Sequence, residues 1–148
     1  MLSTTCKYAV RAIIFIARKG TSESRVNARV IASELGIPMQ FLSKILQIFV
    51  RRELLKSFKG PTGGFYLAKD SHDISLFDIV EIIDGPAFFE TCLIGNGPCD
   101  GSINKRKRCP VHDGYSRVRK EVVEYFKSEN IGEIVERMGH DEDILLKL

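Results

Sequence analysis

The chain has 148 residues, of which 44% are hydrophobic and 28% are charged. This composition excludes a disordered or fibrous protein and predicts one compact domain, with or without an appendage. The longest apolar run near the N-terminus covers only residues 12–17, which is too short for a membrane-spanning helix or a secretory signal. We therefore expect a cytoplasmic protein without a membrane partner, in which the four cysteines are reduced.

Charge is distributed unevenly along the chain. Residues 1–70 carry twelve Lys and Arg against four Asp and Glu, a net charge of +8, whereas the remaining residues carry −5. A basic half joined to an acidic half indicates that the first half binds a polyanion, most simply nucleic acid. The alternative is an ordinary solvated surface.

The first half of the sequence predicts three helices. Hydroxyl residues at 3–5 precede apolar positions spaced by three and four, and Lys19-Gly20 closes this first helix. A short helix over residues 30–35 ends at Gly36, and a third helix extends from Phe41 to about Arg52 after the break at Ile37-Pro38. A short helix, a tight turn and a second helix with a strong apolar face are typical of a helix-turn-helix.

A β-hairpin is predicted directly after these helices. Residues 54–58 and 65–68 read as strands, and the glycine-rich residues 59–64 read as the turn between them. Lys56 and Lys59 flank Gly60 and Gly63, an arrangement that suits close approach to phosphates or to a minor groove. The hairpin is thus of the wing type, and the alternative is a plain hairpin turn.

Three further helices are expected in the second half. The first precedes Asp84-Gly85-Pro86 and is expected to pack on the winged domain; the second runs from Gly114 to about Ser128, and the third covers residues 131–138. The apolar stripe of the long helix fits a dimer contact, although the same stripe could belong to the intramolecular core.

Three cysteines and a histidine lie in the glycine-rich stretch between these helices. Cys92, Cys99, Cys109 and His112 form the pattern Cys-x6-Cys-x9-Cys-x2-His. Thiolates and imidazole bind zinc or an iron–sulfur cluster, and the residues alone leave both metals open. A thiol enzyme with Cys109 as nucleophile and His112 as base is a third hypothesis, but no orienting group or substrate pocket is evident, so we do not expect an enzyme.

Four stretches together resemble the bacterial winged-helix transcription regulators typified by the iron–sulfur cluster regulator, a family that includes nitric-oxide, iron and cysteine-metabolism sensors. They are residues 8–12, Gly36-Ile37-Pro38, residues 41–46 and residues 60–67. The resemblance covers nearly the whole chain. It implies a mainly α fold with a small β-hairpin: a winged helix-turn-helix domain at 1–84, a cysteine-rich sensor loop at 85–113, and a dimerisation helix with a short C-terminal helix at 114–148.

The same resemblance implies the site residues. The DNA-binding set is Gln40, Ser43, Lys44 and Gln47 on the recognition helix, with Lys56, Lys59, Gly60 and Gly63 in the wing. The cluster ligands are Cys92, Cys99, Cys109 and His112. Cys6, from its own or the partner chain, is an alternative fourth ligand, although a lone helical cysteine is more often a small buried hydrophobe.

The predicted function is accordingly that of a homodimeric repressor that binds double-stranded DNA at a palindromic operator. Its loop would sense iron–sulfur, redox or nitric-oxide status through a cluster, with 2Fe–2S favoured over 4Fe–4S, and such a cluster can be lost on purification. The alternative is the same DNA-binding regulator with structural zinc, or with a thiol switch that holds no cluster, at the same site.

Overall fold

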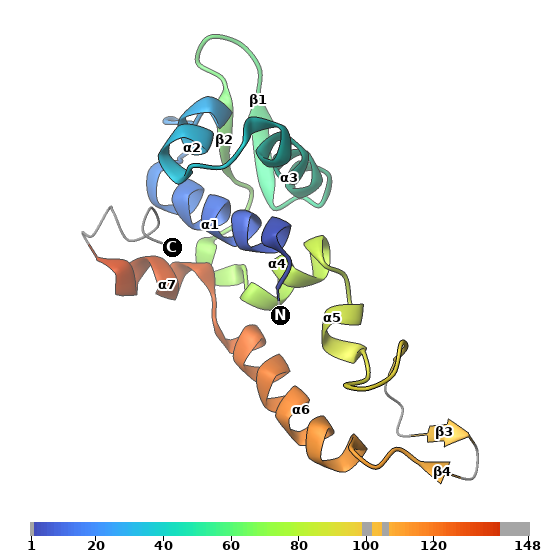
Figure 1. Cartoon of the computed structure of the whole chain (residues 1–148). Coiled ribbons are helices and arrows are strands. Elements are labelled where there is room, and N and C mark those ends of the chain that lie inside the picture. The colour runs from blue at the N-terminus through green and yellow to red at the C-terminus, as the bar shows by residue number, and fades with distance from the viewer. Residues whose placement is uncertain (1, 99–101, 105–106, 140–148) are drawn as a thin grey trace.

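The computed structural model describes residues 2–98, 102–104 and 107–139, and it is mainly helical with a small antiparallel hairpin, as predicted (Figure 1). The first half contains α1 (Thr4–Lys19), α2 (Ala28–Leu35), α3 (Met39–Arg51), β1 (Leu55–Phe58) and β2 (Gly64–Leu67). The second half contains η1 (Ser71–Asp73), α4 (Leu76–Ile83), α5 (Ala87–Glu90), β3 (Ser102–Asn104), β4 (Lys107–Arg108), α6 (His112–Ser128) and α7 (Ile131–Met138).

Local capping explains where the first helices begin and end. The Ser3 hydroxyl accepts a hydrogen bond from the Cys6 amide at 3.0 Å and so caps the N-terminus of α1. Gly36 ends α2 in the left-handed conformation, with φ of 60°, which glycine adopts without a steric penalty. The Arg11 side chain then donates to the Leu35 carbonyl at 2.8 Å, which ties α1 to this turn.

The main core surrounds α1, which contacts α2, α3, α4 and α7. Its fully buried side chains come chiefly from α1 and α3, among them Ile13, Ile16, Leu42, Ile45 and Phe49. Phe41, which we expected on the apolar face of α3, is 43% exposed. The buried face of α3 is therefore narrower than the sequence pattern suggests, and it is formed by Leu42, Ile45, Leu46 and Phe49.

The predicted hairpin is present as two antiparallel strands joined by a tight turn. Leu55 pairs with Leu67, and Phe58 pairs with Gly64. A Cβ atom at position 63 would lie 2.3 Å from the Phe58 carbonyl oxygen, so the turn requires glycine there. An isolated antiparallel bridge pairs Val26, between α1 and α2, with Phe65 of β2. This bridge was not predicted, because a single bridged residue has no periodicity.

The second half contains predicted and unpredicted elements. The Ser75–Asp78 capping box begins α4 where a helix was expected, and α7 has the predicted bounds. The short α5 and the strands β3 and β4 were not predicted, and α6 begins at His112, two residues before Gly114. In Figure 1, α6 begins near β3 and β4, at the opposite end of the molecule from the hairpin, and runs back to α7 at the helical body.

None of the helices within residues 2–98 and 107–139 combines the length and the apolar composition that crossing a membrane requires.

Candidate DNA interface and sensor loop

One face of α3 presents polar side chains to solvent. Gln40, Lys44 and Gln47 are exposed and spaced by four and three residues, and Ser43 between them is half-buried. The fold fixes this orientation because the opposite face of α3, including Leu42 and Phe49, is fully buried. The structure thus places the predicted recognition residues of α3 together on one surface.

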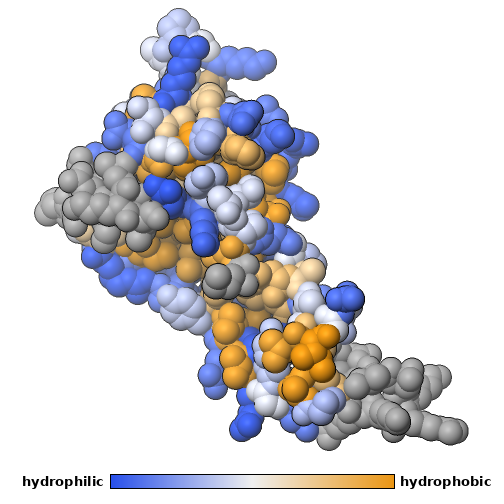
Figure 2. Space-filling model, in the orientation of Figure 1, coloured by the Kyte–Doolittle hydropathy of each residue, from blue (hydrophilic) through white to orange (hydrophobic). Residues whose placement is uncertain are grey.

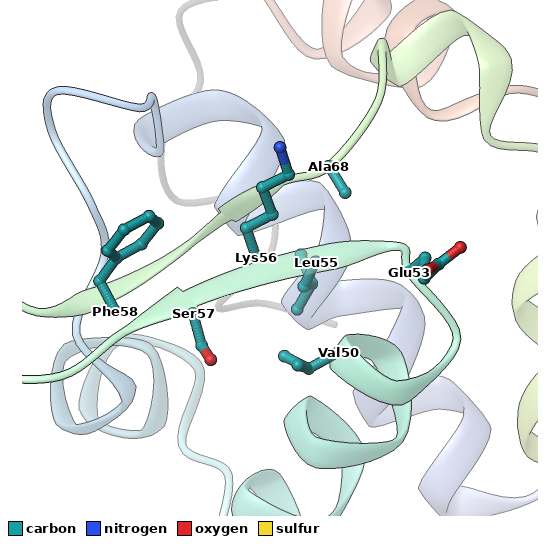
Figure 3. A pocket seen from close by; sticks show the side chains of 7 residues that line it. All are labelled: Val50, Glu53, Leu55, Lys56, Ser57, Phe58 and Ala68. Carbon is teal, nitrogen blue, oxygen red and sulfur yellow. The ribbon is translucent and has the colours of Figure 1, made fainter.

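The hairpin carries the other predicted DNA-binding residues at the same end of the molecule (Figure 1). Lys56 and Lys59 are exposed, and Figure 3 shows Lys56 on the opposite side of β1 from Leu55 and Ser57, which face α3. Gly60 is exposed with φ of +107°. The Gly63 amide donates to the Gly60 carbonyl at 2.9 Å, so this amide closes the turn itself.

The segment after α5 folds back on itself around Cys92. A bridge joins Thr91 to Pro98, and the Cys92 amide donates to the Gly97 carbonyl at 2.9 Å. A Cβ atom on Gly95 would lie 3.4 Å from the Cys92 sulfur, so the half-buried thiol packs against that glycine. Arg119 of α6 donates to the Glu90 carbonyl at 3.1 Å and links α6 to the start of this segment.

Cys109 and His112 lie at the N-terminus of α6. Cys109 is only 8% exposed, and its carbonyl accepts a hydrogen bond from the His112 amide at 3.1 Å. Cys99 lies outside the residues that the structure describes. The sequence therefore places a thiol and an imidazole beside the start of a helix, and a second thiol on the segment after α5.

These donors fit a metal or a cluster by their chemistry. Thiolate and imidazole suit both zinc and iron–sulfur clusters. Among the described residues, however, no three His, Cys, Asp or Glu side chains converge on a point where one ion could be held. Cys92, Cys109 and His112 are therefore not gathered into a site in this arrangement.

The structure shows Cys6 as a buried hydrophobe. It is fully buried in a second, smaller core with Val80 and Phe89, between α1, α4 and α5. Burial, together with the nearby Asp84 carboxylate, raises the pKa of the Cys6 thiol to about 12. Because the thiolate is the form that binds metals, this environment opposes the alternative of Cys6 as a cluster ligand.

His72 makes contacts that the sequence did not reveal. Its Nδ1 lies 3.0 Å from Asp70, and its Nε2 lies 3.0 Å from Glu136 of α7. These two hydrogen bonds raise the pKa of His72. Its ring also packs so closely on Gly132 that a Cβ atom there would lie 2.5 Å from Nδ1. Asp70 is two residues from His72, but nothing in the sequence signals the distant Glu136.

Comparison with known proteins identifies the family. The Rrf2 family model, described as an iron-dependent transcriptional regulator, matches residues 2–137. This chain belongs to the Rrf2 family. Two relatives illustrate the similarity. An HTH-type transcriptional regulator of Aquifex aeolicus is 29% identical over 135 residues, which cover 91% of each chain. An rrf2-like regulator of Rhodobacter capsulatus is 31% identical over 132 residues, which cover 86% of this chain and 83% of the relative.

Solved structures share the Rrf2 fold. One of them is CymR, the global cysteine regulator of B. subtilis. Its structure matches with a TM-score of 0.77 at 20% identity, covering 93% of this chain and 97% of that one. IscR of T. potens has a TM-score of 0.73 at 21% identity, covering 93% of this chain and 87% of that one. The Rrf2 relatives are transcription regulators and not enzymes, so the thiol-enzyme hypothesis is set aside.

Proposed function

We propose that this Rrf2-family transcription regulator is a cytoplasmic homodimeric repressor that binds a palindromic operator. In this proposal residues 1–84 read DNA, residues 85–113 sense the signal, and residues 114–148 hold the dimer together. The observation that carries the proposal is the exposed face of α3, where Gln40, Lys44 and Gln47 project from a helix whose other side is buried in the core.

Base readout through α3 agrees with the chemistry of these side chains. Gln can form paired hydrogen bonds with adenine, and Lys can contact guanine or a phosphate. Lys56 and Lys59 on the hairpin add positive charge at the same end of the molecule. The hairpin is therefore suited to contact the backbone beside the groove that α3 enters.

A dimer is supported by the outer face of α6. Val118, Val122 and Tyr125 are 54%, 38% and 56% exposed and recur at helical spacing. Val123 and Phe126 lie on the adjacent face and pack against the smaller core. Figure 2 shows apolar side chains at this end of the molecule, over α6 and the loop after α5. An apolar stripe of this kind is suited to bury itself against the same stripe of a second copy.

We assign regulation to the sensor loop because it contains Cys92, Cys99, Cys109 and His112. Their thiols and imidazole are groups that can bind a metal or a cluster. We favour a 2Fe–2S cluster at these residues, with zinc as the alternative. A bound iron–sulfur cluster would supply a group that reacts with oxidants and nitric oxide. The Thr91–Pro98 bridge would fix Cys92 on one side of the loop, and burial would fix Cys109 on the other side.

The decisive experiment selects duplexes from a random DNA pool with anaerobically purified protein. We expect an inverted repeat whose half-sites are about one helical turn apart, bound by two chains per duplex. The same preparation should absorb in the visible range and contain iron and sulfide. Colourless protein with stoichiometric zinc would replace the cluster by its alternative, whereas failure to select any duplex would overturn the proposed function.

A further inference from the structure

The hairpin has an outer face that is distinct from its tip. The Val26–Phe65 bridge places the end of the α1–α2 loop beside β2, with amide-to-carbonyl distances of 3.0 and 2.9 Å. Successive side chains alternate between the two faces of a sheet, so Arg25 lies on the face opposite the buried Val26. Figure 3 shows Lys56 and Phe58 on the side of β1 that faces away from Val50 of α3.

Aromatic and cationic side chains are packed together on this outer face. The Arg25 guanidinium carbon lies 4.0 Å from the centre of the Phe58 ring. Phe58 in turn stacks on Tyr66 at 6.0 Å between ring centres and 19° between planes. Lys56 is the cross-strand neighbour of Tyr66. We call Arg25, Lys56, Phe58 and Tyr66 the wing platform.

The cations of the wing platform and of the neighbouring hairpin tip are not paired with acidic side chains within the described chain. Arg25, Lys56 and Lys59 form no ion pair with any described carboxylate. The Arg25 Nε atom is buried and lacks a hydrogen-bond partner among the described residues, although buried polar groups are usually paired. Phe58 is also 45% exposed, with the guanidinium held over its ring. The Arg25 guanidinium, held in place without a carboxylate partner, can therefore bind an anion from outside the chain.

The chemistry of arginine indicates which anion this is. The Arg25 guanidinium carbon lies over the Phe58 ring, and the terminal N–H donors of a guanidinium can pair with two phosphate oxygens. Since Lys56, Phe58 and Tyr66 of the platform belong to the same hairpin as the proposed wing contacts at Lys59 and Gly60, a phosphate of the bound duplex is the anion within reach.

We propose that Arg25, held in place by Phe58, binds a backbone phosphate of operator DNA. This inference rests on the proposed function, and it extends the DNA interface beyond α3 and the hairpin tip to a residue of the α1–α2 loop. Phe58 acts as a positioning residue, because it orients the guanidinium and does not itself contact DNA. Arg25 contributes affinity and alignment of the wing and not base recognition.

The test measures binding of the selected operator by fluorescence anisotropy over a range of salt concentrations. Arg25→Ala should weaken binding about tenfold and lower the salt slope by about one. Arg25→Lys should be intermediate, because the charge remains but the paired donors are lost. Phe58→Leu should weaken binding by less than Arg25→Ala and leave the salt slope near that of the wild type. Thermal unfolding of each variant reports any loss of folded protein.

A series of duplexes in which single phosphates are replaced by neutral methylphosphonates distinguishes a direct phosphate contact of Arg25 from an indirect effect of the substitution on the fold. We expect one position near the wing where the replacement weakens the wild type but has no further effect on Arg25→Ala. If every replacement affects both proteins equally, or if Arg25→Ala binds as the wild type does, the inference is wrong. The proposed function would stand in that case, provided that Lys44→Ala still loses affinity. A wild type that binds no duplex would overturn both.

Discussion

Lys44 carries a charge that the fold itself does not use. It is exposed on α3, and no described carboxylate pairs with it. If Lys44 contacts operator DNA, Lys44→Ala should lower affinity about fivefold to tenfold and reduce the dependence of log K on log salt by about one. Anisotropy titrations at several salt concentrations measure both quantities. Lys120→Ala, an exposed lysine of α6 that is distant from α3, is the matched control and should bind as the wild type does.

Cys6 should be unreactive for as long as the protein is folded. Its thiol is fully buried, and its raised pKa of about 12 leaves almost no thiolate at neutral pH. In metal-free protein at about pH 8, iodoacetamide should therefore label Cys6 at least a hundredfold more slowly than it does in denaturant. Peptide mass spectrometry follows the label, with the half-buried Cys92 as the internal comparison. Rapid labelling of native Cys6 would contradict the burial described above.

Single residues with local consequences were predictable from the sequence. The Ser3 cap, the left-handed Gly36 and the glycines of the hairpin turn each depend on their immediate neighbours. Contacts that join distant parts of the chain were not predictable. Arg25 reaches Phe58 only because Val26 pairs with Phe65. The exposure of Phe41 likewise depends on which neighbours cover α3.

The long helix α6 offers a direct test of dimerisation at the level of one element. Val118→Asp places a charge in the exposed apolar stripe, where it costs the monomer little but would be buried in a dimer. We expect the dimer dissociation constant to rise at least tenfold, as measured by analytical ultracentrifugation. Lys120→Asp, on the opposite side of the same helix, is the control and should leave the dimer intact. A fully dimeric Val118→Asp protein would place the interface elsewhere.

The attachment of α7 should depend on pH through His72. Hydrogen bonds to Asp70 and Glu136 raise the pKa of His72 above its ordinary value of 6.5. A raised pKa in the folded state stabilises the protein below about pH 6.5, and this contribution is lost as pH rises through the folded value. Hydrogen exchange of α7 amides should therefore differ most between wild type and His72→Gln near pH 5.5, and least near pH 8.5.

Gly132→Ala provides a second variant for this prediction. The added methyl group would displace the His72 ring, so the variant should behave as His72→Gln does. Other titrating groups are common to the proteins and cancel in the comparison. A difference between wild type and His72→Gln that does not change with pH would show that the ring contributes packing only.

Elements with strong periodicity were predicted well, and short or irregular ones were not. The residues of α1, α3, α4 and α7 repeat at helical spacing, and their bounds agree with the sequence pattern to within a few positions. The four-residue α5 is too short to show a period. Its residues Phe88 and Phe89 form a cluster with Phe77 and Phe126, so tertiary packing and not local propensity accounts for this element.

For the whole molecule, the prediction is that the loop thiols control DNA affinity. A variant with Cys92, Cys99 and Cys109 changed to Ser should lose visible absorbance and iron, and its affinity for the operator should differ at least fivefold from that of the anaerobic wild type. Circular dichroism and ultracentrifugation control for folding and dimerisation. Identical binding by the two proteins would leave a DNA-binding regulator whose signal enters elsewhere.

The chemistry of the candidate sensor was predictable, but its geometry was not. Residue types and spacing alone identify Cys92, Cys109 and His112 as donors. Their relative positions depend on how the loop crosses from α5 to α6, which no local pattern encodes. The described donors do not converge on one point in this structure, whereas the polar face of α3 follows directly from helical spacing.

The outward course of α6 has a mechanical consequence. Its 17 residues span about 25 Å, and Cys109 directly precedes its N-terminal end, while the hairpin occupies the opposite end of the molecule (Figure 1). If a straight helix of this length tilts by about five degrees about one end, its other end moves by roughly 2 Å. In a dimer joined along the two α6 helices, that tilt would change the distance between the two DNA-binding domains. Neither DNA-binding domain would need to rearrange internally.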